Sequence, residues 1–340
     1  MPAAVAAGPA IRELGKVTLS SSSGQISDIS VTPAGDIYVL DANSLVITHF
    51  SATGALQNQF PISGVPESSQ GHLYFHPEIT VDQNRNVYIA ATWRPAPRQT
   101  STALFVFDSN GHYARTIPLI PRIEVRHLAI DKDGNFYALG VDPDFFKWKA
   151  NLCLLVHKYG PDGKRLTAFS ACPPNLILRQ PNSAVPGPGF DTLNKETSLG
   201  KVSVIGGVVY NELAVSHRVR AFDLSGKQLL DTVLEPAAAG VTNSPDPTAS
   251  SLDILRRVLP LPNNRFLSEW VHTEKSGGAR QNARSIAIHD SSGRKLTTAT
   301  IPDPGTAIVL ADETGLCYML RKKDVTGHAF DLVRVSIDVN

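Results

Sequence analysis

The sequence predicts an all-β fold, a six-bladed β-propeller with four antiparallel strands per blade, in which the N-terminal strand closes the last blade. Three observations lead to this prediction. One strand-and-turn unit recurs six times, tight glycine turns separate its strands, and the last copy lacks a strand that the N-terminus can supply. No stretch shows a long helical period. A single closed ring suits 340 residues, because closed all-β folds often exceed the usual domain size.

Each repeat unit is an apolar strand, a polar turn, a second strand ending near an aromatic residue, a variable loop, and two further strands around another turn. The strands are enriched in β-branched and aromatic residues and are bounded by turn residues. We place all units in one domain, residues 1–340. The predicted blades span approximately residues 26–60, 76–119, 126–170, 200–234, 252–301, and 306–340 together with 12–19.

The turns inside the units have the chemistry of tight hairpins. Pro33-Ala34-Gly35, Lys132-Asp133-Gly134 and Pro161-Asp162-Gly163 combine a preset φ with a glycine that accepts positive φ. Such turns are expected between antiparallel strands of one blade.

The sixth unit ends after its third strand, residues 330–339, where the chain stops. The segment 12–19 has the pattern of an outer strand, so we predict that it pairs with the last blade and protects its edge. A seventh blade would have to lie within residues 172–200. That segment holds five prolines and no strand pattern, so we interpret it as an insertion.

Segments 29–41, 79–89 and 128–138 share an apolar strand, a polar turn and an aromatic on the second strand. In this they resemble NHL repeats, and the last three units match the pattern in outline. The resemblance implies a six-bladed propeller of the TolB-like or lactonase-like superfamily. It implies no single function, because such propellers include scaffolds, sensors, lyases and lactonases.

The long connections of the predicted blades all fall on one face. The turns after each first and third strand are short, whereas segments such as 61–76, 91–102, 172–200 and 273–284 join strands at the opposite end. Long loops on one side of a rigid scaffold usually carry function. Neutral insertion is the alternative interpretation.

Polar residues are expected around the central channel on that face. Counting back ten positions from the second-strand aromatic, or its equivalent, aligns one residue from each blade: Asp28, Glu78, His127, Gly200, Arg257 and Ile308. Carboxylates and an imidazole could bind a cation or act as acid and base, and an arginine could hold a carboxylate or phosphate. The alternative is a solvated channel with structural pairs, for instance Glu78 with Arg257.

A rim of larger side chains is predicted above this ring. Trp93, Arg94 and Arg98 lie in the long loop of blade two, and Trp148 lies in the matching loop of blade three. Aromatic and arginine side chains are typical of recognition surfaces. Alternatively, the aromatics hold their own loops onto the blades.

We therefore expect a binding propeller that presents its long-loop face to a protein, a peptide or a small anionic ligand. The predicted ligand-binding residues are Asp28, Glu78, His127, Arg257, Trp93, Arg94, Arg98 and Trp148, and no cofactor is expected. The recognisable catalytic and nucleotide-binding motifs are absent, which favours a non-enzymatic role. A purely structural module remains a further possibility.

The alternative is a metal-dependent hydrolase or lyase, which the resemblance to lactonase-like propellers implies. It would hold Ca²⁺ at Asp28, Glu78 and His127. Those enzymes offer several oxygen ligands around the channel, whereas Gly200 and Ile308 occupy two of the aligned positions here.

The charge and hydropathy of the chain bear on two classes of partner, nucleic acid and membrane. A formal charge of +1 gives no reason to expect nucleic acid, and no apolar run approaches the roughly 18 residues of a membrane span. The first ten residues lack the basic region of a signal peptide, and a periplasmic or secreted location would require that a signal had been removed. We expect a monomer.

Cys153, Cys172 and Cys317 are interpreted as buried apolar residues, with the pairing of Cys153 and Cys172 left open.

Overall fold

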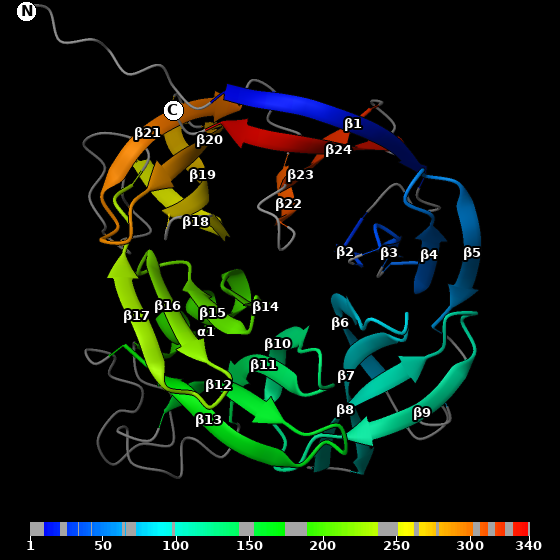
Figure 1. The fold of residues 1–340 in the computed structure, drawn as a ribbon. Helices are drawn as coiled ribbons and strands as arrows, with labels where there is room; N and C mark the ends of the chain where they lie inside the picture. Colours follow the sequence, from blue (N-terminus) through cyan, green and yellow to red (C-terminus); the bar gives the residue numbers. More distant parts are fainter. Residues whose placement is uncertain are drawn as a thin grey trace, which may run out of the picture.

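The protein is described from a computed structural model. The structure describes residues 10–20, 26–32, 34–41, 43–62, 65, 73–96, 99–142, 153–173, 189–236, 251–261, 265–276, 279–301, 307–311, 317–323 and 329–338. Six separate four-stranded antiparallel sheets radiate around a central axis, as the sequence predicted (Figure 1). The innermost strand of each blade is the first strand of its repeat unit.

The first three blades follow one another along the chain. Blade one comprises β2 (Asp28–Val31), β3 (Ile37–Asp41), β4 (Val46–Phe50) and β5 (Leu56–Pro61). Blade two comprises β6 (Leu73–Val81), β7 (Val87–Ala96), β8 (Gln99–Phe107) and β9 (Tyr113–Pro118). Blade three comprises β10 (Glu124–Ile130), β11 (Phe136–Val141), β12 (Leu154–Tyr159) and β13 (Arg165–Ala171).

The last three blades complete the ring. Blade four comprises β14 (Lys201–Ile205), β15 (Val208–Leu213), β16 (Arg218–Asp223) and β17 (Gln228–Val233). Blade five comprises β18 (Ser251–Leu261), β19 (Arg265–Ser276), β20 (Ala279–His289) and β21 (Lys295–Ile301). Blade six comprises β22 (Ala307–Ala311), β23 (Cys317–Lys322), β24 (Ala329–Asp338) and the N-terminal strand β1 (Ala10–Ser20).

The N-terminal strand closes the ring, which confirms the prediction. β1 pairs antiparallel with β24 from Ala10 opposite Asp338 to Ser20 opposite Ala329. Its Thr18 hydroxyl also donates a 2.8 Å hydrogen bond to the carboxylate of Asp331. The fourth strand of blade six therefore comes from the other end of the chain, and its pairing covers the outer edge of β24.

The hydrophobic core lies between neighbouring blades. Leu40, Phe60, Ile89 and Phe105, for example, are buried in one cluster that joins blades one and two. Alternating strand residues point to opposite faces of each sheet, so each blade contributes apolar side chains to the blades on both sides. This stacking fixes where each innermost strand begins.

The segment between blades three and four contains a helix that the sequence analysis missed. α1 (Gly189–Leu199) lies beside the start of β14 and buries Leu193 against blades three and four. Glu196 binds the next blade, because its carboxylate accepts hydrogen bonds from the amides of Val215 (2.8 Å) and Ser216 (2.7 Å). Its helical pattern is short, which explains why periodicity did not reveal it.

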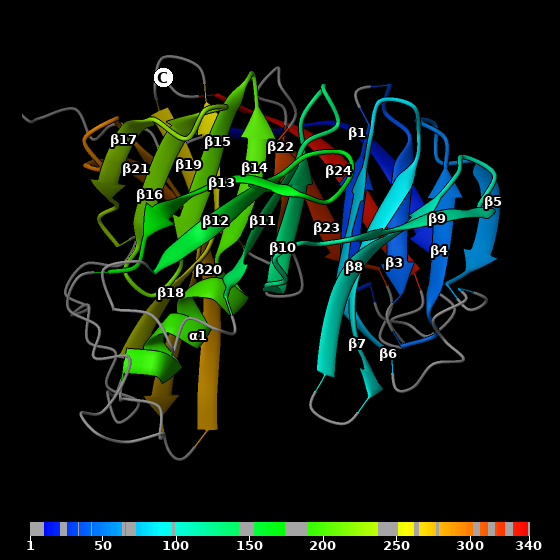
Figure 2. The same cartoon turned by 90° about the horizontal axis from the view of Figure 1, so that it is seen from below.

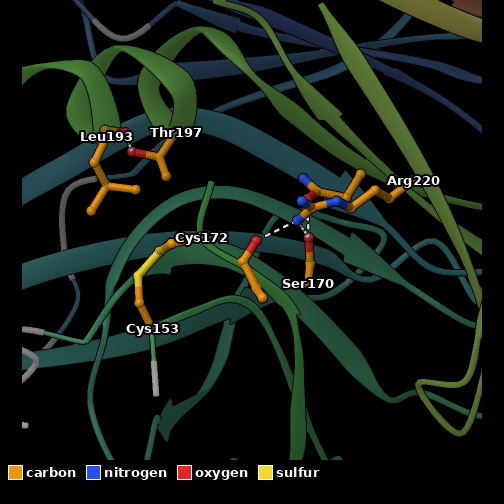
Figure 3. Close-up of a disulfide and its surroundings, with 8 residues drawn as sticks. Cys153, Ser170, Cys172, Leu193, Thr197 and Arg220 are labelled. Carbon is orange, nitrogen blue, oxygen red and sulfur yellow. Dashed lines mark hydrogen bonds between the residues drawn. A yellow bond between two sulfur atoms is a disulfide. The ribbon is translucent and has the colours of Figure 1, made fainter. Parts of the chain in front are cut away.

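A disulfide joins Cys153 to Cys172, a pairing that the sequence had left open (Figure 3). The two residues extend β12 and β13 by one position, and the Cys172 amide donates a 3.0 Å hydrogen bond to the Cys153 carbonyl. Their Cα atoms lie 5.4 Å apart, which is the usual spacing across a disulfide.

Two connections predicted as irregular loops continue as hairpins. β7 and β8 pair out to Ala96 opposite Gln99, and β19 and β20 pair out to Ser276 opposite Ala279. Both hairpins and α1 project from the same face, the lower one in Figure 2. This long-loop face is also where the innermost strands begin.

Candidate functional site

Four innermost strands carry a β-bulge or a similar irregularity. The register shifts between Phe75 and Ile79 in β6, between Val125 and His127 in β10, between Leu255 and Arg257 in β18, and between Ile308 and Leu310 in β22. A bulge leaves one residue outside the ladder and changes the direction of its side chain. The bulges coincide with the positions that the repeat alignment singled out.

Carboxyl groups of one blade bind backbone amides of the next blade beside these bulges. Each amide belongs to the residue that follows an aligned position. The bonds run from Ile79 N to Asp28 (3.0 Å), from Leu128 N to Glu78, and from Val258 N to Glu212 (2.9 Å). Three acidic side chains therefore have a structural role, because they link consecutive blades at the centre of the ring.

Glu78 and His127 form a close pair across blades two and three. The Glu78 carboxyl lies 2.5 Å from His127 Nδ1, and the two side chains are only 14% and 9% exposed. Burial raises the pKa of Glu78 to about 8, against the opposing effect of Lys201 and Arg257. Burial and then Lys201 hold the pKa of His127 well below its usual value. Both shifts favour the neutral forms of the Glu78 carboxyl and the His127 imidazole.

Two cations from blades four and five face these acids across the axis. Lys201 opens β14 and Arg257 lies in the bulge of β18. Of the charged groups that act on Asp28 and on Glu78, Lys201 has the largest effect. It acts across the central axis, because blade four lies opposite blade one. Within the described part of the chain, neither cationic side chain has a hydrogen bond or a close ion pair of its own.

Burial shifts the remaining titratable groups toward their neutral forms. It raises the pKa of Asp28 and raises the pKa of Glu212 to about 7, although Arg257 and Lys201 both oppose the second shift. Burial, followed by the charge of Arg257, lowers the pKa of Lys201. Clustered perturbed groups of this kind are frequent at functional sites. We call these six residues the central cluster: Asp28, Glu78, His127, Lys201, Glu212 and Arg257.

The position of Lys201 depends on the glycine before it. A Cβ atom on Gly200 would lie 2.3 Å from the carbonyl oxygens of both Glu196 and Glu212. Only glycine therefore lets the end of α1 approach the end of β15. Because β14 starts directly afterwards, Lys201 lies opposite Glu212 in the ladder.

The structure brings together four residues that the sequence predicted for the ring: Asp28, Glu78, His127 and Arg257. In the alternative interpretation Glu78 would pair with Arg257; the close partner of Glu78 is His127, and Arg257 acts on it through its charge. Sequence reasoning missed Lys201 by one position, because Tyr210 lies opposite Ser203, seven positions back, whereas Tyr38 lies opposite Ser30, eight positions back. It also missed Glu212. The Gly206-Gly207 turn could have revealed Glu212 as the cross-strand partner of Lys201.

The predicted rim lies outside what the structure describes. The backbones of Trp93 and Arg94 belong to β7, where Trp93 pairs with Ser101, but their side chains are not among the described ones. Arg98, Trp148 and the side chain of Ile308 are also outside the described residues. The rim therefore stays a prediction.

The charges of the central cluster disfavour a Ca²⁺ site. In the described ranges, no three His, Cys, Asp or Glu side chains are arranged to hold a metal ion. His127 Nδ1 is taken by Glu78, and Lys201 and Arg257 place two positive charges opposite Asp28 and Glu78. These charges would repel a divalent cation.

No family model matches the sequence, and the comparison with curated proteins found no relative. No helix among the described residues is both long and apolar enough to cross a membrane.

Solved structures of the same architecture match nearly the whole chain. A Bacteroides fragilis protein, named as a candidate exported protein, has a TM-score of 0.59 at 10% identity, covering 97% of this chain and 96% of that one. A Bacteroides vulgatus member of the DUF4221 family has a TM-score of 0.57 at 8% identity, covering 98% and 99%. A PQQ-bound aldose sugar dehydrogenase from Streptomyces coelicolor has a TM-score of 0.51 at 13% identity, covering 97% and 98%. At such identities these likenesses show one thing, that the chain has the six-bladed β-propeller fold.

Proposed function

We propose that the protein is a binding propeller whose central cluster takes a small oxyanion, a carboxylate or a phosphate group. The observation that supports the proposal is that the acids of the central cluster have hydrogen-bond partners in the described part of the chain, whereas its two cations do not. The acids Asp28, Glu78 and Glu212 are bound to backbone amides, whereas the side chains of Lys201 and Arg257 have no direct partner within the described residues.

An oxyanion would supply the partner that these cations lack. An arginine fork and an ammonium group bind carboxylate and phosphate oxygens through charge-assisted hydrogen bonds, which are the stronger ones in proteins. The partial burial of the cluster strengthens such contacts, since they are less screened than at an open surface. Glu78 does not oppose the anion at neutral pH, because its raised pKa keeps it protonated.

Titration calorimetry with acetate and with inorganic phosphate tests the proposal and distinguishes the two oxyanion sources. We expect the wild-type protein to bind one of them, and Lys201→Met or Arg257→Met to weaken that binding by about tenfold or more. Lys227→Met is the control, because Lys227 is exposed on a turn away from the central cluster. A wild-type protein that binds neither anion, or a Lys201→Met variant with unchanged affinity, would contradict the proposal.

Several finer interpretations from the sequence remain proposals. The rim of Trp93, Arg94, Arg98 and Trp148 would lie on the ligand's outer side, where a peptide or protein could extend the contact. The resemblance to NHL repeats remains an interpretation of the strand pattern. The monomeric state also remains a proposal. The disulfide supports a periplasmic or secreted location, since disulfides persist in oxidising compartments.

The Ca²⁺-dependent hydrolase or lyase is the second candidate, with Asp28, Glu78 and His127 as ligands. The opposing cations weigh against it. Elemental analysis of the purified protein and melting curves with and without CaCl₂ test it directly. A bound calcium ion, together with a calcium-dependent rise in Tm that Asp28→Asn removes, would favour the hydrolase over the anion-binding propeller.

A further inference from the structure

We infer that Glu212 controls the anion site by taking up a proton when the oxyanion binds, so that affinity rises as the solution becomes more acidic. This inference rests on the proposed anion-binding function and names its regulation.

The position of Glu212 carries the argument. It lies opposite Lys201 in the β14–β15 ladder, and its Oε2 accepts a 2.9 Å hydrogen bond from Val258, the residue after Arg257. Its side chain is thus fixed between the two cations, and the residue is only 4% exposed. Any anion held by both cations must lie close to the Glu212 carboxyl.

The other elements packed against Glu212 offer it no competing charge. The ladder position opposite it on β16 is the apolar Val219. On α1, Glu196 is bound to the amides of Val215 and Ser216. From the rest of the central cluster, Asp28, Glu78 and His127 face it across the axis. Asp28 and Glu78 have hydrogen-bond partners of their own and also interact with the charge of Lys201. Lys201 and Arg257 are therefore the charges that Glu212 and the anion would share.

The sign of the pH dependence follows from this sharing. An ionised Glu212 repels the anion and competes for both cations, whereas a protonated Glu212 does neither. Because the pKa of free Glu212 is about 7, roughly half of the molecules carry the competing charge at neutral pH. The bound anion raises this pKa further, and the protein takes up a proton on binding.

Calorimetry in two buffers of different ionisation enthalpy measures the proton uptake directly. We use acetate as the probe, because it stays ionised from pH 6 to 7.5. If only phosphate binds, sulfate replaces it in this measurement, because phosphate itself titrates near pH 7 and would add its own proton exchange. The wild-type protein should take up about half a proton per anion at pH 7. For acetate, the affinity should also be about fourfold weaker at pH 7.5 than at pH 6.

Glu212→Gln keeps an oxygen that can accept the Val258 amide but cannot ionise. We expect this variant to bind the anion at least as tightly as the wild type at pH 7, with proton uptake near zero and little change from pH 6 to 7.5. Glu124→Gln, at an exposed carboxylate paired with Arg126, should behave as the wild type. Melting curves confirm that each variant is folded.

The two proposals fail in different ways. An anion that binds the wild type without proton uptake, or a Glu212→Gln variant that retains the wild-type uptake, overturns the role of Glu212 and leaves the anion site standing. A wild-type protein that binds neither probe overturns the proposed function itself.

Discussion

At the scale of single residues, the buried carboxyl of Glu78 contributes less to stability as the pH rises. The pKa of Glu78 is about 8 in the folded protein, against an ordinary value of 4.5. Between these values the folded protein holds a proton that the unfolded chain has lost. The free energy of unfolding that Glu78 contributes therefore falls with increasing pH across this window.

Replacing Glu78 by Gln removes this titration. Relative to the wild type, Glu78→Gln should gain up to a few kcal/mol of stability as the pH rises from about 4.5 to 8. Urea unfolding of both proteins at several pH values measures the difference. The exposed Glu124→Gln variant should show no such trend, and a difference between Glu78→Gln and wild type that is independent of pH would contradict the assignment.

The turn aspartates of blades two and three show what the NHL-like pattern does physically. Asp131 accepts hydrogen bonds from the amides of Asp133 and Asn135 and from the Tyr137 hydroxyl, and Asp82 does the same in blade two. Blade one has Thr32 at this position, and the buried hydroxyl of Tyr38 has no hydrogen-bond partner among the described residues.

Equivalent tyrosines should therefore respond differently to loss of the hydroxyl. Tyr137→Phe should lower the free energy of unfolding by about 1 kcal/mol, since it leaves Asp131 without a 3.1 Å hydrogen bond. Tyr38→Phe should be neutral or stabilising, because it removes a buried group that lacks a partner. Chemical denaturation compares the two, and equal losses would show that the Tyr38 hydroxyl is satisfied.

At the scale of elements, the disulfide fixes the ends of β12 and β13 where the chain leaves blade three. The bond closes a sequence separation of 19 residues and lies beside Leu193 of α1 (Figure 3). The Cys153→Ser, Cys172→Ser double variant should unfold with a free energy about 3 kcal/mol lower than the oxidised wild type. Wild-type protein treated with a reductant should match the variant. An unchanged unfolding curve, or free thiols at both positions in the purified protein, would contradict the pairing.

The elements show why part of the fold was predictable and part was not. Strand patterns and glycine turns are local, and the positive φ of Gly35, Gly134 and Gly163 agrees with the predicted hairpins. The long hairpins β7–β8 and β19–β20 lack the apolar alternation of a buried strand, so they looked like loops. Residues of the central cluster were predictable in the blades where the first strand keeps the same offset from the aromatic of the second strand. The cluster was missed at Lys201, because the first two strands of blade four are joined by a hairpin one residue shorter than in blade one, and at Glu212, which lies on a second strand.

At the scale of the whole molecule, β1 makes the contacts of a fourth strand. In blades one to five, a glycine in the outer turn packs against the last strand of the preceding blade. A Cβ atom on Gly111 would meet Phe60 of β5, one on Gly226 would meet Phe169 of β13, and one on Gly54 would meet Val17 of β1. The ring therefore closes with the same packing that it uses between other blades.

Removing β1 should open the ring. A variant that lacks residues 1–20 exposes the edge of β24 and the surface that Gly54 packs against, so we expect aggregation and a broad melting transition. A shorter deletion that stops before Ala10 retains the whole strand and should elute and melt as the full chain does. A soluble 1–20 deletion with an unchanged Tm would refute the closure.

The ring brings side chains from five blades to one point, and the central claim is that this point binds an oxyanion between Lys201 and Arg257. A crystal structure obtained with selenate at pH 6, where Glu212 is protonated, tests it most directly, because the anomalous signal of selenium marks the anion. We predict a selenium peak in contact with Lys201 Nζ and the Arg257 guanidinium. Peaks confined to other surfaces, with none at the central cluster, would contradict the account.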